Sequence, residues 1–221
     1  MGGTMADSVK ILFEEATGEI QEKKSRFIAT IRPVKTLDEA NAFIDEIKKK
    51  YWDARHNCSA LVIGEKNEIS RCSDDGEPSG TAGRPMLEVI MGAGIHNVCV
   101  VVTRYFGGVL LGTGGLVRAY QGAVKEALSQ AHIIEKTMGR HLEISCDYNG
   151  IGKIQYIMGQ KGIIPLDTIY AEKVTIKLAL ELGSIDEFLK EITEALNGNL
   201  EYEAGQETYF TVLDGKTIIM T

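Results

Sequence analysis

The chain has 221 residues, 44% of them hydrophobic, which suits one or two globular domains with real cores. Its net charge of −7 excludes a protein that binds nucleic acid over a broad basic surface, so any contact with RNA needs a local patch. The longest apolar runs fall far short of the roughly 20 residues of a membrane span.

The N-terminus has no apolar stretch typical of a signal peptide, and residues 1–4 read as a leader before Met5. The four cysteines are Cys58, Cys72, Cys99 and Cys146. They form no C-x-x-C pair, and three of them lie in or beside apolar runs. We therefore expect a cytoplasmic protein, no contact with membranes, no disulfide and no metal site.

The first half of the chain predicts a mixed α and β domain. Alternating runs in residues 9–33 predict two or three strands. A helix is predicted at 36–51, where Thr36 and Glu39 have capping-box spacing. The remaining elements follow in order: a strand at 58–64, a short helix at 83–95, a strand buried on both faces at 96–106, and a helix at 116–131.

A second unit starts near residues 136–139, because residues 1–136 carry a net charge of −1 and residues 137–221 carry −6. The sequence predicts a strand at 141–148, a helix at 150–162, strands at 163–170 and 173–180, a helix at 184–198 and a last strand or pair at 200–212. Ser184 and Glu187 have capping-box spacing, and Gly198 is the expected stop. This βαββαβ order is typical of a ferredoxin-like domain. We expect an α+β protein with domains 1–136 and 137–221.

The stretch RCSDDGEPSGTAGRP, residues 71–85, reads as a loop rather than as a helix or strand. Three glycines permit positive φ and close backbone approach: Gly76, Gly80 and Gly83. Ser79 or Thr81 is placed to cap the helix that Pro85 helps to start. A helix start also offers free N–H groups to an anion. Ordinary turn and capping chemistry explains the same residues, so both interpretations are open.

A second glycine-rich segment, RYFGGVLLGTGGLVR, covers residues 104–118. It begins with Arg104 and Tyr105, which we expect to be exposed, and ends with Arg118, one turn into the next helix. Its small residues are Gly107, Gly108, Gly112, Thr113, Gly114 and Gly115. We expect the two glycine segments to face one another across a single anion-binding cleft. The spacing fits neither a dinucleotide fingerprint nor a P-loop, so no cofactor is expected.

Three acids in the first loop oppose an anion: Asp74, Asp75 and Glu77. We expect at least one of them to point away, to pair with an arginine or to hold a cation. Other constellations are weaker. His56, Cys58 and Cys72 are conceivable metal ligands or a thiol–histidine pair, although burial is the plainer interpretation of Cys58. The helix face formed by Arg118, Gln121 and Lys125 fits a solvated surface.

Taken together, these segments resemble the IMPACT protein family. KKSRFIA, HNCSALVIG, SDDGEPSGTAGRPMLEVI and VVVTRYFGGVLLGTGGLVRAYQGAVKEAL carry the resemblance over roughly residues 20–130. The stretch from about 138 to 210 resembles the small C-terminal domain of bacterial members. The resemblance implies the fold of ribosomal protein S5 domain 2 for the N-terminal domain. For the C-terminal domain it implies a ferredoxin-like fold similar to a late domain of elongation factor G.

Eukaryotic relatives dampen the general-control stress kinase by competing for its activator, with an extra RWD domain that we do not expect in this chain. The resemblance implies a non-catalytic regulator of translation or of the stress response, which binds RNA or a ribosome-associated partner. Arg104, Tyr105 and Arg118 suit such binding, because arginine binds phosphate and an aromatic ring stacks on a base.

Two alternatives to this function stay open. One is a binder of, or enzyme for, a phosphorylated or other anionic small molecule, with Asp75 or Glu77 as base. The other is a protein adaptor that uses the acidic C-terminal domain.

Overall fold

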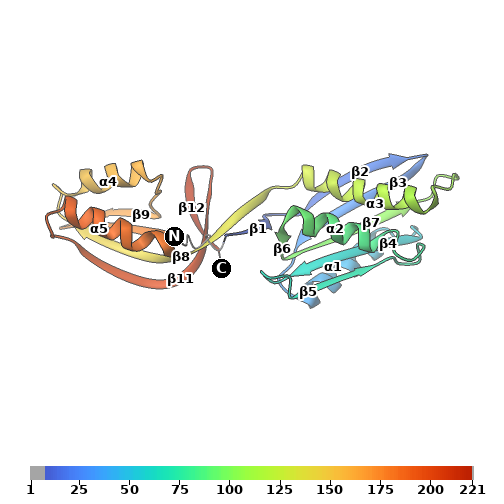
Figure 1. Ribbon diagram of the computed structural model, residues 1–221, viewed down its shortest axis with the longest axis horizontal. Helices are drawn as coiled ribbons and strands as arrows, with labels where there is room; N and C mark the ends of the chain where they lie inside the picture. The colour runs from blue at the N-terminus through green and yellow to red at the C-terminus, as the bar shows by residue number, and fades with distance from the viewer. Residues whose placement is uncertain (1–7, 221) are drawn as a thin grey trace, which may run out of the picture. The chain divides into compact units, whose positions relative to one another are not determined.

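The computed structural model describes residues 8–220 and divides into two compact units (Figure 1). The N-terminal unit covers residues 9–134, and the C-terminal unit covers residues 135–220 with Ser8. The division falls inside strand β8 (Ile133–Cys146). Both units combine helices with sheets, which confirms the α+β class. No helix within residues 8–220 has the length and apolar character needed to cross a bilayer.

The N-terminal unit is built on a five-stranded sheet in which all neighbouring strands are antiparallel. In spatial order the strands are β2 (Ala16–Glu22), β3 (Ser25–Pro33), β7 (Val98–Tyr105), β4 (His56–Ile63) and β5 (Ile69–Ser73). Strand β1 (Ser8–Leu12) pairs in parallel with the short β6 (Ile95–His96). The central strand β7 is buried on both faces as its apolar sequence predicts, with Val100 facing one core and Val101 the other.

Helices cover both faces of this sheet (Figure 1). Helix α1 (Leu37–Lys50) packs on one face, and α2 (Gly83–Ala93) and α3 (Gly112–Ser129) pack on the other. The capping prediction for α1 is confirmed, because the Thr36 hydroxyl accepts a hydrogen bond from the Glu39 N–H at 3.2 Å. Helix α3 begins four residues before the predicted start at 116. Its first turn is rich in glycine, which has a low helix propensity, so the sequence pattern does not indicate a helix before residue 116.

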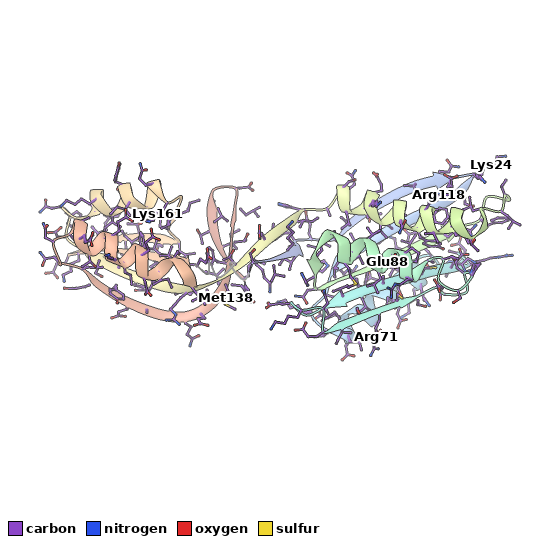
Figure 2. All side chains as sticks on the ribbon, viewed as in Figure 1. Lys24, Arg71, Glu88, Arg118, Met138 and Lys161 are labelled. Carbon is purple, nitrogen blue, oxygen red and sulfur yellow. The ribbon has the colours of Figure 1, made fainter. Side chains whose placement is uncertain are left out.

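The antiparallel register gathers several chain segments at one end of the N-terminal unit. Arg104 near the end of β7 lies opposite Phe27 of β3 and His56 of β4. The tip of the β2–β3 hairpin, the start of β4 and the loop that leads into α3 are therefore at the same end of the sheet. Figure 2 shows Lys24 and Arg118 there. We call this region the Arg104 end of the domain.

The C-terminal unit has one antiparallel sheet with strand order β9-β10-β8-β11-β12. Its other elements are α4 (Ile151–Gln160), β9 (Asp167–Tyr170), β10 (Val174–Glu181), α5 (Ile185–Ala195), β11 (Glu201–Leu213) and β12 (Lys216–Met220). The element order is the predicted βαββαβ with one additional strand, β12, at its end. Both helices contribute to one apolar core with β8 and β10, including Ile154, Phe188, Ile144 and Ile176.

Two local predictions are wrong. Arg71 to Ser73 were expected in a loop but form the end of strand β5, where Cys72 pairs in register with Ala60. The backbone hydrogen bonds of a sheet edge override the weak strand propensity there. Ser184 does not cap α5. Its hydroxyl donates to the Glu181 carbonyl at 2.9 Å, because a short 3₁₀ turn (Leu182–Ser184) precedes the helix.

Candidate functional site

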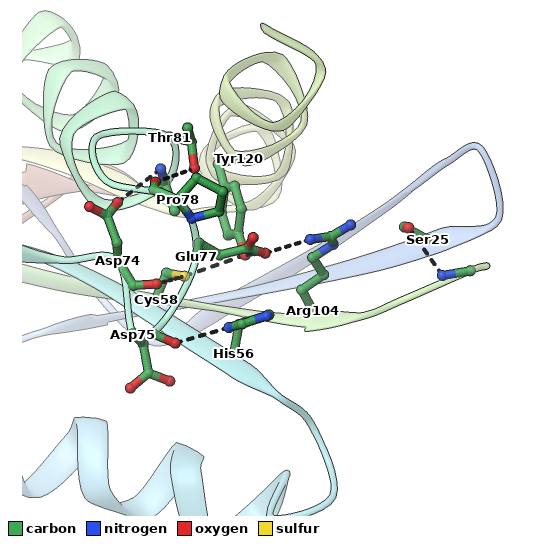
Figure 3. A network of polar contacts seen from close by, with 12 residues as sticks. Ser25, His56, Cys58, Asp74, Asp75, Glu77, Pro78, Thr81, Arg104 and Tyr120 are labelled. Carbon is green, nitrogen blue, oxygen red and sulfur yellow. Dashed lines mark hydrogen bonds and ion pairs between the residues drawn. The ribbon is translucent and has the colours of Figure 1, made fainter. Parts of the chain in front are cut away.

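A buried ion pair joins the acidic loop after β5 to the end of β7 (Figure 3). Arg104 Nη1 donates to Glu77 Oε1 at 2.7 Å, and only 8% and 3% of the two side chains are exposed. The Tyr120 hydroxyl of α3 donates to the same oxygen at 2.8 Å. The expectation of an exposed Arg104 is therefore wrong, because Glu77 reaches over it from the loop. The expectation that one acid pairs with an arginine is met by Glu77.

Asp74 caps helix α2, and this corrects the prediction that Ser79 or Thr81 does so. Asp74 Oδ1 accepts from the N–H groups of Ala82 and Gly83 at 3.0 and 2.8 Å, and Oδ2 accepts from Gly80 at 2.8 Å. Partial burial opposes the charged form, but these three donors outweigh it and lower the pKa of Asp74. The start of α2 is thus filled by a carboxylate of the chain itself.

The third acid, Asp75, is also engaged within the protein. Its Oδ1 pairs with Lys48 Nζ at 2.7 Å, and its Oδ2 accepts from the Asn57 N–H at 2.7 Å. His56 Nδ1 lies 2.9 Å from the Asp75 carbonyl oxygen. Thr81 donates its hydroxyl to the Pro78 carbonyl at 2.7 Å instead of capping. Each of the three acids in this loop is therefore bound to other groups of the protein, and Glu77 is the one that binds Arg104.

Arg104 retains hydrogen-bonding capacity that the protein does not use. Its Nε–H is buried and has no hydrogen-bond partner within residues 8–220. The guanidinium carbon lies 5.5 Å from the ring centre of Phe27 and 5.6 Å from that of Phe106. A buried donor without a partner costs about 1–3 kcal/mol. A ligand oxygen at this nitrogen would remove that cost.

The glycine segment that follows β7 is shaped by close backbone contacts. A Cβ added at Gly107 would lie 2.0 Å from the carbonyl carbon of Lys24, so no other residue fits there without movement. The Gly107 N–H donates to Ser25 Oγ at 3.1 Å. Gly108 and Gly112 have φ values of +83° and +71°, which favour glycine. Within the described chain no side chain forms a capping hydrogen bond at the start of α3.

The predicted site residues fall into three groups by exposure. The buried members are Glu77, Thr81, Gly83 and Arg104. Half-buried are Asp74, Asp75, Tyr105, Gly107 and Gly115, and exposed are Gly76, Ser79, Gly80, Gly108, Thr113, Gly114 and Arg118. Tyr105 donates its hydroxyl to Asp53 at 2.8 Å and so belongs to the α1 side of the region. The contacts among residues 8–220 unite Glu77 with Arg104, but none links Ser79 or Arg118 to that pair.

Burial keeps the thiol and the phenol nearest to the ion pair in their neutral forms. Burial raises the pKa of the Cys58 thiol to about 12, and burial also raises the pKa of Tyr120. Cys58 donates to the Asp74 carbonyl at 3.0 Å, whereas Cys72 is exposed, and all four cysteines are free. In the part of the chain that is described, no three histidine, cysteine or acidic side chains are placed to hold a metal ion.

Several residues that build the site escaped sequence reasoning. Tyr120 reads simply as part of the apolar face of a helix, yet its hydroxyl holds Glu77. Lys24 and Ser25 lie about eighty residues before the glycine segment that they contact. The only signal for them is the KKS run itself, where two lysines stand between two strand-like stretches.

Comparisons with known proteins match both units. The family described as the Impact N-terminal domain matches residues 23–128, and a domain of unknown function (DUF1949) matches residues 144–199. IMPACT family member YvyE of Bacillus subtilis is 43% identical over 196 residues, which cover 89% of this chain and 90% of that protein. IMPACT family member YigZ of Escherichia coli is 38% identical over 187 residues, covering 84% and 92%.

A solved structure and a eukaryotic relative add to these matches. The crystal structure of a hypothetical protein shares 36% identity with a TM-score of 0.58, covering 91% of this chain and 98% of that one. Protein IMPACT of Xenopus laevis is 36% identical over 98 residues, which are 42% of this chain and 31% of that protein. The likeness to the frog protein is thus limited to less than half of this chain.

Proposed function

Because the chain belongs to the IMPACT family, we propose that it is a non-catalytic regulator of translation in the stress response. In this proposal it binds RNA, free or on a ribosome-associated partner, through the Arg104 end of its N-terminal domain. The translational role rests on the family resemblance of its motifs. The RNA-binding role rests on the geometry around Arg104.

One observation carries the proposal, which is the unpartnered Nε–H of the buried Arg104. The Glu77 carboxylate fixes one side of the guanidinium, so the group is held in one orientation before any ligand arrives. Phosphate oxygens are strong acceptors for such a fixed guanidinium. The uncapped start of α3 and the adjacent glycines add backbone donors to the same ligand.

A nucleic acid suits this region better than a substrate of an enzyme. Phe106 is 51% exposed beside the guanidinium, so a base can stack on its ring while Arg104 holds a phosphate. The groups that an enzyme would use as base are already engaged, Glu77 by Arg104 and Asp75 by Lys48. The high pKa of Cys58 keeps its thiol protonated at neutral pH.

The test is the affinity of the full chain for a fluorescent single-stranded RNA of about twelve nucleotides. Arg104→Lys keeps a cation for Glu77 but removes the Nε–H and the planar fork. We expect it to weaken binding at least about tenfold, since one charge-assisted hydrogen bond is worth about 1.5–3 kcal/mol. Arg84→Lys is the control, because Arg84 pairs with Glu88 on the exposed surface of α2. Equal affinities for the folded Arg104→Lys and Arg84→Lys variants would refute the proposal.

A further inference from the structure

Two hairpins of this chain have the same turn conformation but very different turn residues. Lys23 and Lys24 join β2 to β3 with φ values of 45° and 67°. Asp214 and Gly215 join β11 to β12 with φ values of 49° and 71°. Positive φ at both positions is the conformation for which Asn-Gly and Asp-Gly are strongly preferred. The β11–β12 hairpin follows this preference and the β2–β3 hairpin does not.

The lysine pair is therefore not explained by the shape of the turn. Side chains with a Cβ are strained at positive φ, and lysine lacks the short polar group by which asparagine and aspartate offset that strain. Within residues 8–220 neither Lys23 nor Lys24 forms an ion pair. Residues in such strained conformations cluster at functional sites, where the surrounding structure holds them in place. Two unpaired cations at such a tip also stand out in a chain of net charge −7.

The hairpin tip is fixed against the segment that follows Arg104. Gly107 packs so closely on Lys24 that an added Cβ would lie 2.0 Å from its carbonyl carbon. The Gly107 N–H also donates to Ser25 Oγ, and Phe27 lies opposite Arg104 in the sheet. The backbone that carries the two lysines is thus held beside the glycine segment of the proposed site.

We infer that Lys23 and Lys24 bind consecutive phosphates of the same strand that Arg104 binds, so that the ligand is a single-stranded RNA rather than a lone phosphate compound. This inference rests on the proposed function and extends it. Lysine ammonium groups bind phosphate as point charges and need no fixed geometry, which suits a solvent-exposed tip. The hairpin supplies the local basic patch that an acidic chain needs in order to contact RNA.

The decisive variant is Lys23→Asn combined with Lys24→Gly, which installs the preferred turn. We expect a higher urea midpoint of unfolding, because the new residues suit positive φ. We also expect at least about tenfold weaker RNA binding at about 0.1 M salt, and a salt slope smaller by about 1.4 for two lost contacts. A variant that is more stable but binds worse separates a ligand role from a structural one. Lys125→Gln with Lys190→Gln, on α3 and α5, is the control of equal charge change.

The outcomes separate this inference from the proposed function. If Arg104→Lys loses binding while the hairpin variant keeps the affinity and salt slope of the unmodified chain, the inference is wrong and the proposed function stands. If the unmodified chain binds no RNA, both fall. A polyglutamate chain of similar length that binds as tightly as RNA, and loses as much from the hairpin variant, would make an acidic protein segment the partner and overturn the inference.

Discussion

Arg104 and Glu77 form an ion pair in which both side chains are buried, and Tyr120 donates to the same carboxylate oxygen. The pair ties the loop after β5 to strand β7, and the tyrosine adds a tie to α3. Within residues 8–220, Arg104 Nε is the one nitrogen of this network that is buried without a hydrogen-bond partner, and the proposed function assigns it to a ligand. The stability of the domain and the proposed function therefore depend on the same side chain.

Removing the acid from this pair should destabilise the N-terminal domain strongly. Glu77→Ala leaves the Arg104 charge buried without a counterion, and such changes cost about 3–5 kcal/mol. Urea unfolding followed by circular dichroism measures the loss. Glu88→Ala, which breaks the exposed pair with Arg84, should change stability by less than about 1 kcal/mol. Similar losses for the two variants would mean that the buried pair is not a structural tie.

Asp74 should make stability depend on pH in the acid range. Its pKa is lowered in the folded state, so its contribution is complete above the unfolded value of about 3.9 and disappears as pH falls through the folded value. Asp74→Asn should cost about 0.5–2 kcal/mol at neutral pH through the weakened cap. The gap between the variant and the unmodified chain should close on acidification. A gap that stays constant down to the acid unfolding transition would contradict this assignment.

The four thiols should differ sharply in reactivity. Burial raises the pKa of Cys58 and of Cys99 to about 12, so both stay protonated and covered at neutral pH. Cys146 is buried, whereas Cys72 is exposed on β5. Mass spectrometry after brief iodoacetamide treatment should find one label, on Cys72, and none on a native Cys72→Ser variant. Labelling of native Cys58 at a comparable rate would show that the acidic loop after β5, which contacts Cys58 through Asp74, opens.

Two glycine substitutions should have opposite effects on stability. Gly107→Ala places a Cβ 2.0 Å from the Lys24 backbone and should cost at least about 1–3 kcal/mol. Gly92→Ala in α2 meets no atom within 4 Å and should stabilise by about 0.5–1 kcal/mol. Thermal unfolding of both variants checks the contrast. A neutral Gly107→Ala would show that the hairpin tip can move away from the glycine segment.

The elements of this fold are largely readable from the sequence, because their apolar periodicity and caps are local. The helix at α1 follows from Thr36 and from its apolar stripe, and strand β7 follows from its run of valines. The start of α3 could not be predicted, since glycine disfavours helices and only tertiary packing selects a helix there. For residues 200–212 the local pattern predicted a last strand or pair. The structure forms one strand there, β11, and strand β12 lies beyond that range.

The candidate site was only half predictable, for a different reason. The glycines and Arg104 stand out by composition. An ion pair with an arginine was one of the arrangements predicted for the acids, and Glu77 forms it with Arg104. Which partner each acid takes depends on residues distant in sequence, such as Lys48 for Asp75 and Tyr120 for Glu77. Ser79 and Thr81 have capping chemistry, yet it is Asp74 that accepts the hydrogen bonds from Ala82 and Gly83 at the start of α2. Sequence alone cannot rank such competing hydrogen bonds.

The most direct test of the central claim is an NMR titration of the ¹⁵N-labelled full chain with a single-stranded RNA of about twelve nucleotides. The account predicts that the Arg104 Nε–H signal shifts on addition of RNA, together with the backbone amides of Gly107, Gly108 and Gly112. An unchanged Arg104 Nε–H signal, with shifts confined to residues 135–220, would contradict it.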